Sequence, residues 1–184
     1  CSSDLLVKML YGEVQPDEGT IAINGRLVSL RGPADAIDLG IGMVHQHFML
    51  VDNFTALENV VLGHEPRSGR LRLKVDWELA RAKVSQLARE NSIDLELDAL
   101  TSTLGVGDRQ RIEILKVLFR GAQIIILDEP TTVLVPQEVA VLCTSLRALA
   151  SSGHTVIFIS HKLDEVMSIA DEVTVMRAGR TTLT

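Results

Sequence analysis

Short uninterrupted runs of apolar residues mark three places along the chain where a buried strand is predicted. Each run is followed directly by polar residues, a pattern typical of strands that are buried on both faces. The runs lie at 41–44, 124–128 and 154–160. Longer stretches that read as helices follow the second and third runs, at 136–150 and 162–170. This alternation, which ends with a further strand over 172–179, predicts a parallel sheet covered by helices.

The first part of the chain predicts small elements separated by turns. Residues 5–12 have the pattern of a helix end closed by a glycine. Asn24-Gly25 is the dipeptide of a tight hairpin turn, so we expect short strands at 20–23 and 26–30. A short helix is predicted over 33–38, because proline is favoured at the first helical position.

The middle of the chain, from about residue 56 to residue 120, is dominated by helical patterns. Its clearest part is an amphipathic segment at 76–91. Strand patterns lie on both sides of this block, so the block is predicted to be an insertion. We therefore expect a discontinuous α/β core, 1–50 and 121–184, and a helical subdomain at 51–120.

Composition narrows the class of protein. The 184 residues, 46% of them hydrophobic, are enough for one domain with a sizeable core. A net charge of −6 without a basic run argues against nucleic acid as a partner, and no apolar stretch is long enough for a membrane helix. Cys1 and Cys143 lack metal or redox spacing, which favours a reducing compartment. Cys1 resembles the first residue of a mature lipoprotein, but an apolar segment follows directly, so we expect a truncated start.

Three of the predicted strands deliver polar side chains at their ends. Asp128 and Glu129 follow one strand, His161 follows the next along the chain, and Gln46 follows the strand over 41–44. Ligands of open α/β sheets bind at the carboxyl ends of the strands. Taken alone, the two acids fit an acidic turn and the histidine fits a surface side chain. The histidines on either side of Gln46 lack further metal ligands, so we interpret them as structural.

A helix is predicted to begin within the segment Leu104 to Arg111 and to reach residue 120. The free amides at a helix N-terminus attract phosphate. Asp108 lies in the first turn of this helix, where an acid also stabilises the helix by about 0.3–1 kcal/mol.

In this order the motifs resemble those of an ABC transporter ATP-binding domain, most like the first ATPase domain of simple-sugar and nucleoside importers. The resemblance implies a P-loop NTPase (RecA-like) fold, a mostly parallel sheet with an inserted α-helical subdomain, and ATP and Mg²⁺ as cofactors. Residues 132–138 are similar to the D-loop, through which paired domains touch. The implied site consists of Glu129 as general base, His161 as sensor of the γ-phosphate, Gln46 and Asp128 as Mg²⁺ ligands, and Gly105, Val106, Gly107 and Asp108 as cap on a phosphate bound by the opposite subunit.

The chain departs from the family pattern at two places. The phosphate-binding string Gly-x-x-x-x-Gly-Lys-Ser/Thr does not occur in the 184 residues, and alignment places Ser3 at its lysine and Asp4 at its Mg²⁺-binding hydroxyl. We therefore expect the N-terminal strands and phosphate loop to be missing, part of the sheet to be uncovered and nucleotide binding to be weakened. The family also usually has a serine at Gly105 and a neutral residue at Asp108.

The resemblance implies the ATP-binding subunit of an importer that couples ATP hydrolysis to uptake of a small solute, of sugar or nucleoside type. Its partners would be a membrane permease and a second nucleotide-binding domain, at the cytoplasmic face of the plasma membrane. An alternative is a degenerate, non-catalytic ABC domain or fragment with a structural or regulatory role. DNA-repair and translation factors share the motifs, but a long coiled-coil insertion and a basic surface are absent from this sequence.

Overall fold

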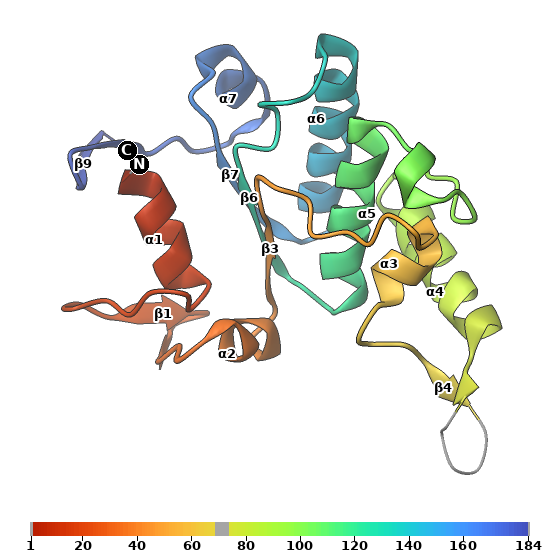
Figure 1. Ribbon diagram of the computed structural model, residues 1–184. Coiled ribbons are helices and arrows are strands. Elements are labelled where there is room, and N and C mark those ends of the chain that lie inside the picture. Colours follow the sequence, from red (N-terminus) through yellow and green to blue (C-terminus); the bar gives the residue numbers. More distant parts are fainter. Residues whose placement is uncertain (1, 69–73, 184) are drawn as a thin grey trace.

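A three-stranded parallel sheet lies at the centre of the computed structural model (Figure 1). The structure describes residues 2–68 and 74–183, with all side chains in this range except those of Ser2 and Ser3. The strands are β3 (Ile41–Val44), β6 (Ile124–Asp128) and β7 (Thr155–Ile159), in the order β3-β6-β7. Their predicted positions and parallel direction are confirmed.

Helices cover both faces of the sheet (Figure 1). The helices α5 (Val106–Phe119) and α6 (Pro136–Ser151) lie on one face and α1 (Ser2–Leu10) lies on the other. Side chains of a strand alternate between the faces. Accordingly Ile125 and Leu127 belong to the core cluster of α5 and α6, whereas Ile126 belongs to a second cluster with Val7 of α1.

The elements before β3 form as predicted. They are the hairpin strands β1 (Ile21–Ile23) and β2 (Arg26–Val28), followed by helix α2 (Pro33–Asp38). Asn24 and Gly25 both have positive φ, 51° and 76°, as their tight turn requires. Gly12 follows α1 with φ 79°, and a Cβ atom there would lie 2.6 Å from the carbonyl oxygen of Gly32. No larger residue fits this close approach of two backbones.

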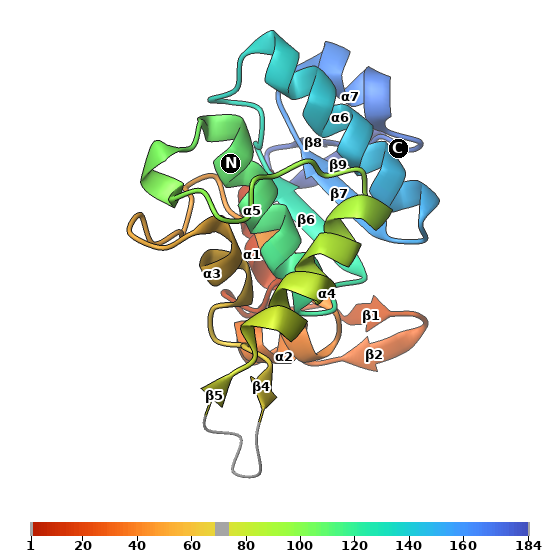
Figure 2. The same ribbon diagram turned by 90° about the vertical axis from the view of Figure 1, so that its right-hand side faces the viewer.

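The helical block contains α3 (Ala56–Val61), α4 (Trp77–Glu90) and the short 3₁₀ helix η1 (Thr101–Thr103), and its helices pack against α5. Thr55 and Asp76 cap α3 and α4 by accepting hydrogen bonds from backbone amides of the first turn. The block also contains two short antiparallel strands, β4 (Arg67–Ser68) and β5 (Lys74–Val75), which project from it (Figure 2). The sequence pattern did not indicate this pair.

The predicted last strand of the parallel sheet is wrong. After α7 (Leu163–Ile169), strand β8 (Val175–Arg177) pairs with β9 (Arg180–Leu183) as an antiparallel hairpin, and in the described part of the chain it does not join the sheet. Ala178 and Gly179 have positive φ, 48° and 76°, so the chain reverses locally there. Strand β7 is consequently an edge strand of the described sheet, and its side chains are exposed or half-buried.

Within the described ranges, no helix combines the length and the apolar character that crossing a membrane requires.

Candidate functional site

The carboxyl ends of the three parallel strands meet at one edge of the sheet, which we call the carboxyl edge. Val44 lies opposite Leu127 and Asp128 lies opposite Ile159, so the residues that follow β3, β6 and β7 come together there. Gln46, Asp128 and His161, which the sequence placed at strand ends, thus share this edge. Gln46 is exposed, and its side chain makes no hydrogen bond to any described residue.

Asp128 lies where negative charge accumulates. Burial raises the pKa of its carboxyl group above the usual value, and the neighbouring carboxylates Asp4 and Glu129 raise it further. Lys8 and His45 act in the opposite direction. The described residues contain no group of three or more His, Cys, Asp or Glu side chains that could hold a metal ion.

Glu129 combines an unusual backbone with a contact to His161. Its φ is 47°, in the left-handed region, and its amide donates to the carbonyl oxygen of Ile159 over 3.0 Å. Such a conformation costs a non-glycine residue on the order of 1–3 kcal/mol and is common at functional sites. The carboxylate Oε1 lies 2.5 Å from Nε2 of His161, whose side chain is 62% exposed. The predicted general base and the predicted sensor are thus in direct contact at the surface.

A set of bonds around Glu165, which the sequence analysis missed, holds the two loops of the carboxyl edge together. The Glu165 carboxylate of α7 accepts from the hydroxyl of buried Thr131 at 2.5 Å and from Lys162 at 3.1 Å. Lys162 also donates to the carbonyl oxygen of Thr131 over 3.1 Å. These bonds join the loop after β6 to the residue next to His161. The i,i+3 spacing of Lys162 and Glu165 was the available signal.

Helix α1 contributes both an acid and a base to the carboxyl edge. Asp4, predicted at the position of the Mg²⁺-binding hydroxyl, is close enough to Asp128 to raise its pKa and pairs with Lys8 at 3.3 Å. The sequence analysis gave Lys8 no role. Ser3, predicted at the position of the phosphate-binding lysine, has a side chain that lies outside the described part. His45 makes an edge contact with the ring of Tyr11, with ring centroids 5.9 Å apart, which agrees with a structural role.

The first turn of α5, which we call the α5 start (residues 105–108), already has a carboxylate on one of its free amides. Gly105 is the N-cap residue, and the amide of Gly107 donates to Oε1 of Glu138 over 3.2 Å. The other oxygen of Glu138 accepts from the amide of Val135 at 3.1 Å. One carboxylate therefore caps both α5 and α6. Glu138 was predicted only as part of the D-loop segment 132–138, although an acid at the third position of a helix was also a signal for capping.

The charge of Asp108 is compensated within α5. Its carboxylate lies 2.5 Å from Nη1 of Arg111, which also donates to the carbonyl oxygen of Asp94 over 3.2 Å. Val106, between Gly105 and Gly107, is exposed. In the described residues, no hydrogen bond or ion pair links the α5 start to Asp128, Glu129, His161 or Gln46. The bond that the α5 start does make to another element is the one from the Gly107 amide to Glu138 of α6.

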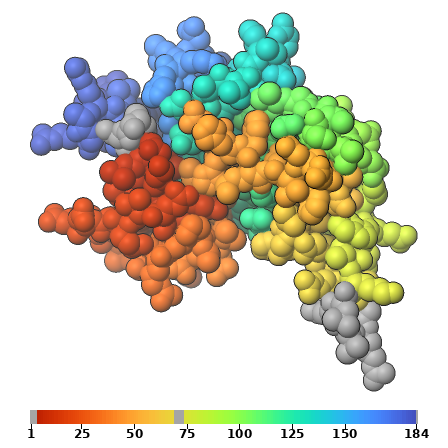
Figure 3. Space-filling model, in the orientation of Figure 1, coloured from red at the N-terminus to blue at the C-terminus, as the bar shows by residue number. Residues whose placement is uncertain are grey.

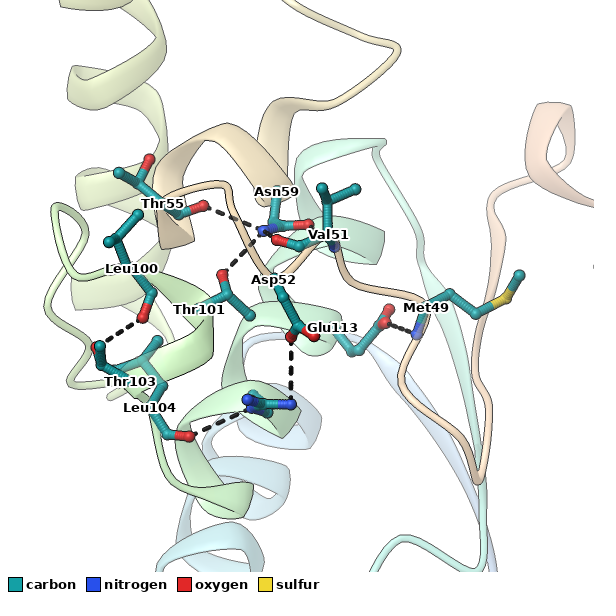
Figure 4. A network of polar contacts seen from close by, with 11 residues as sticks. Met49, Val51, Asp52, Thr55, Asn59, Leu100, Thr101, Thr103, Leu104 and Glu113 are labelled. Carbon is teal, nitrogen blue, oxygen red and sulfur yellow. Dashed lines mark hydrogen bonds and ion pairs between the residues drawn. The ribbon is translucent and has the colours of Figure 1, made fainter.

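Buried Asn59 organises the loop between β3 and α3, which crosses the front of the molecule (Figure 3). Its side-chain amide donates to the carbonyl oxygens of Val51 and Thr55 and to the hydroxyl of Thr101, and its oxygen accepts from the amide of Val51 (Figure 4). Thr101 lies in η1, just before the α5 start. The loop that follows Gln46 is thus tied to the segment that leads into α5.

Comparison with known proteins shows which family the chain resembles. The model of the ABC transporter family matches residues 4–132. The nucleoside import ATP-binding protein NupA of Lactococcus lactis is 45% identical over 175 residues, which are 95% of this chain and 34% of that protein. The ribose import ATP-binding protein RbsA 3 of Rubrobacter xylanophilus is 41% identical over 180 residues, covering 97% of this chain and 36% of that protein. The chain spans about a third of the length of these relatives.

Solved structures show the same fold. A nucleotide-free ATP-binding cassette from an ABC transporter superposes with a TM-score of 0.82 at 23% identity, covering 98% of this chain and 74% of that one. The cbiO1 protein of Clostridium perfringens, part of the ABC transporter complex cbiONQ, gives a TM-score of 0.80 at 26% identity, covering 98% and 71%. The family match over most of the chain, the relatives and the shared fold lead to one conclusion: this chain belongs to the ABC transporter family.

Proposed function

We propose that this chain binds ATP together with Mg²⁺ and serves as the ATP-hydrolysing part of an importer for a small solute of sugar or nucleoside type. The observation that carries the proposal is the carboxyl edge, where Glu129 contacts His161 beside Asp128. The names of the relatives, which are import ATP-binding proteins for a nucleoside and for ribose, support the class of solute.

The residues of the carboxyl edge fit Mg²⁺ bound together with phosphates. Burial, and secondly the carboxylates Asp4 and Glu129, raise the pKa of Asp128 and so disfavour its charged form, which a divalent cation would favour. Mg²⁺ is usually held by one or two carboxylates plus phosphates of the substrate and water. Asp128 would be the direct ligand, and exposed Gln46 would supply an oxygen from the neighbouring loop. Bound Mg²⁺ would neutralise charge on the transferring phosphoryl group.

Glu129 would act as the general base of hydrolysis. Its carboxylate is a quarter exposed and can take a proton from a water molecule placed above the edge. His161 orients that carboxylate through its Nε2 and is exposed enough to reach the γ-phosphate. The bonds of Glu165 keep the two loops that carry these residues at a fixed distance.

The α5 start would cap the phosphate of a nucleotide held by a second nucleotide-binding domain. The position of Gly105, Val106, Gly107 and Asp108 at the N-terminus of α5, with Val106 exposed, supports this role. The amide of Gly107 would have to leave Glu138 before it could bind phosphate. Ser3 is retained as a nucleotide contact on sequence grounds alone.

The partners that we propose are that second nucleotide-binding domain and a membrane permease. In this scheme residues 1–50 and 121–184 form the catalytic core, and residues 51–120 form a helical subdomain that contacts the permease at the cytoplasmic face of the membrane. The packing of α3 and α4 on α5 supports the subdomain as a unit. The names of the relatives as import proteins support the permease.

Calorimetric titration with Mg-ATP, followed by measurement of phosphate release, tests the proposal. We expect binding with a Kd below about 1 mM, and phosphate release that Glu129→Gln abolishes while binding remains. Binding without release by the unaltered protein would favour the non-catalytic alternative, a role that the occupied Gly107 amide also fits. Absence of binding at millimolar Mg-ATP would contradict the proposal.

A further inference from the structure

Helix α5 carries an ion pair on its buried side. The carboxylate of Glu113 lies 3.0 Å from the ammonium of Lys116, and their side chains are only 6% and 13% exposed. Withdrawing two charges from water costs several kcal/mol for each ion, and their mutual attraction often fails to offset this. The pair therefore needs further hydrogen bonds to be stable. The partners in those bonds indicate the role of the pair.

Both charged groups also bind the backbone of a single loop residue, Met49. The amide of Met49 donates to Oε1 of Glu113 over 2.7 Å, and Lys116 donates to the carbonyl oxygen of Met49 over 3.1 Å (Figure 4 shows the first bond). The side chain of Met49 is 68% exposed. Residue 49 is thus attached through its backbone amide and carbonyl groups, as a residue in a β-strand is attached to the neighbouring strand.

The residues just after Met49 are attached to the same helical block. Asp52 lies 3.4 Å from Arg109 of α5, and Val51 exchanges two hydrogen bonds with Asn59 of α3 (Figure 4). On the other side, β3 ends at Val44, which is buried in the sheet. The four residues 45–48 therefore connect a segment fixed to the sheet with a segment fixed to α5.

We propose that Glu113 and Lys116 are positioning residues that lock residues 49–52 onto α5. Residue 49 is thereby held in one place, and the connecting residues 45–48, with Gln46 among them, run between this fixed point and the end of β3. The consequence for turnover rests on the proposed function: where residue 49 is held determines where the proposed Mg²⁺ ligand Gln46 lies at the carboxyl edge.

The test uses one double variant, Glu113→Met with Lys116→Met. Replacing a buried ion pair by apolar side chains of similar volume is often neutral or stabilising, so this variant keeps the packing and removes the bonds to Met49. The matched control is Arg81→Met with Asp98→Asn, which removes an ion pair with a 3.0 Å hydrogen bond in the same helical block. That pair is exposed and does not touch residue 49.

Two measurements need no nucleotide. We expect the amide hydrogen of Met49 to exchange at least about tenfold faster in the double variant, with the thermal midpoint kept and the control unchanged. Spin labels at Met49→Cys and Arg89→Cys, with Cys1 and Cys143 replaced by Ser, report the distance between the loop and α4. We expect a narrow distance distribution with Glu113 and Lys116 present and a broad one without them. Unchanged exchange or an unchanged distribution in the double variant would overturn the proposal.

Turnover supplies the functional measurement. We expect the double variant to lower kcat about tenfold or more and to raise KM for Mg-ATP by a smaller factor, because only the proposed Gln46 ligand is misplaced and Asp128 keeps its place. Parental kcat in a variant with a released loop would also overturn the positioning role. If the unaltered protein shows no turnover, the proposed function fails, while exchange and distance still decide whether Glu113 and Lys116 lock residues 49–52 onto α5.

Discussion

The carboxyl edge and the α5 start, the two regions of the proposed site, treat charge in opposite ways. At the edge, Asp4, Glu129 and Asp128 lie near one another, and the pKa of Asp128 is raised. At the α5 start, Asp108 is paired with Arg111 and the amide of Gly107 is bonded to Glu138. At the edge, burial and the neighbouring carboxylates disfavour the charged form of Asp128, whereas at the α5 start the charge of Asp108 is paired and one free amide is occupied.

This difference teaches what each region requires from a ligand. A cation bound at the edge removes repulsion that the folded chain already contains, so binding there is assisted by the protein. A phosphate at the α5 start must displace the carboxylate of Glu138 from the Gly107 amide. Under the proposed function, the first region would gain from a bound cation, and the second would have to release Glu138 before it could bind an anion. The following predictions test this contrast.

The largest effect is expected at the edge, from Glu129→Gln. Removing a general base reduces turnover by about 10²–10⁴-fold, and glutamine keeps the size of the side chain. Phosphate release from Mg-ATP measures the loss, while calorimetry should show that binding is retained. The control is Glu90→Gln on α4, an exposed acid distant from the site. Equal rates of phosphate release for Glu129→Gln and the unaltered protein would show that Glu129 is not the general base and would contradict the proposed role of the carboxyl edge.

The attachment of the segment that leads into the α5 start depends strongly on Asn59, because Asn59 is 1% exposed and takes part in four hydrogen bonds, one of them to Thr101. We expect Asn59→Ala to lower the free energy of unfolding by about 2 kcal/mol, since buried partners lose their bonds. Urea denaturation measures the change. Asn53→Ala, an exposed asparagine in the same loop, should stay within about 0.5 kcal/mol of the unaltered protein. Similar losses for both variants would show that the network is not the cause.

A smaller effect is expected from Glu138→Ala, which opens the α5 start directly. The variant leaves amides of two helices without their acceptor and should lower the free energy of unfolding by about 1 kcal/mol. Glu138→Gln, which keeps an acceptor oxygen, should lose less. The amide proton of Gly107, followed by nuclear magnetic resonance, should shift in both variants and remain unchanged in Gln137→Ala. An unmoved Gly107 signal in Glu138→Ala would contradict the bond.

The sequence predicted well those features that depend on neighbouring residues. The buried strands, the Asn24-Gly25 turn and most helix ends follow from local patterns, and strand order placed Asp128 and His161 at one edge. The strand over 172–179 was assigned to the wrong sheet, because a turn at Ala178 and Gly179 allowed a local partner. The pattern of a strand indicates that a segment will pair with another strand. Which strand becomes its partner depends on the tertiary structure.

Bonds between distant segments were the part that sequence could not supply. Glu138 and Gly107 are 31 residues apart, and Glu113 and Met49 are 64 residues apart. Two charges within the apolar run 112–118 were a visible signal that something pairs inside α5. Nothing local in the sequence identified Met49 as the partner, because the contact uses only its backbone.

The smallest effect, and the most specific for the charge contrast, is expected from Asp128→Asn. Folding raises the pKa of the Asp128 carboxyl group above its ordinary value of 3.8. Its contribution to the stability of the folded state is therefore fully present below pH 3.8 and is lost as pH rises through the pKa of the folded state. At pH 7 the asparagine variant should therefore be more stable than the unaltered protein, by on the order of 0.5 kcal/mol. Thermal unfolding between pH 3 and 7 should show this difference disappearing toward the acid end.

Asp35 provides a control of opposite sign for Asp128→Asn. The amide of Arg31 donates to its carboxylate, and this holds the pKa of Asp35 below the ordinary value. The contribution of Asp35 to the stability of the folded state is therefore present above pH 3.8, and it is lost as pH falls through the lower pKa of the folded state. Asp35→Asn should therefore be less stable than the unaltered protein at pH 7, and Mg²⁺ should not change that difference.

Added Mg²⁺ should instead cancel the stability advantage of Asp128→Asn, since only the unaltered carboxyl edge gains from the cation. The same sign for both variants would show that negative charge at the carboxyl edge is not in excess.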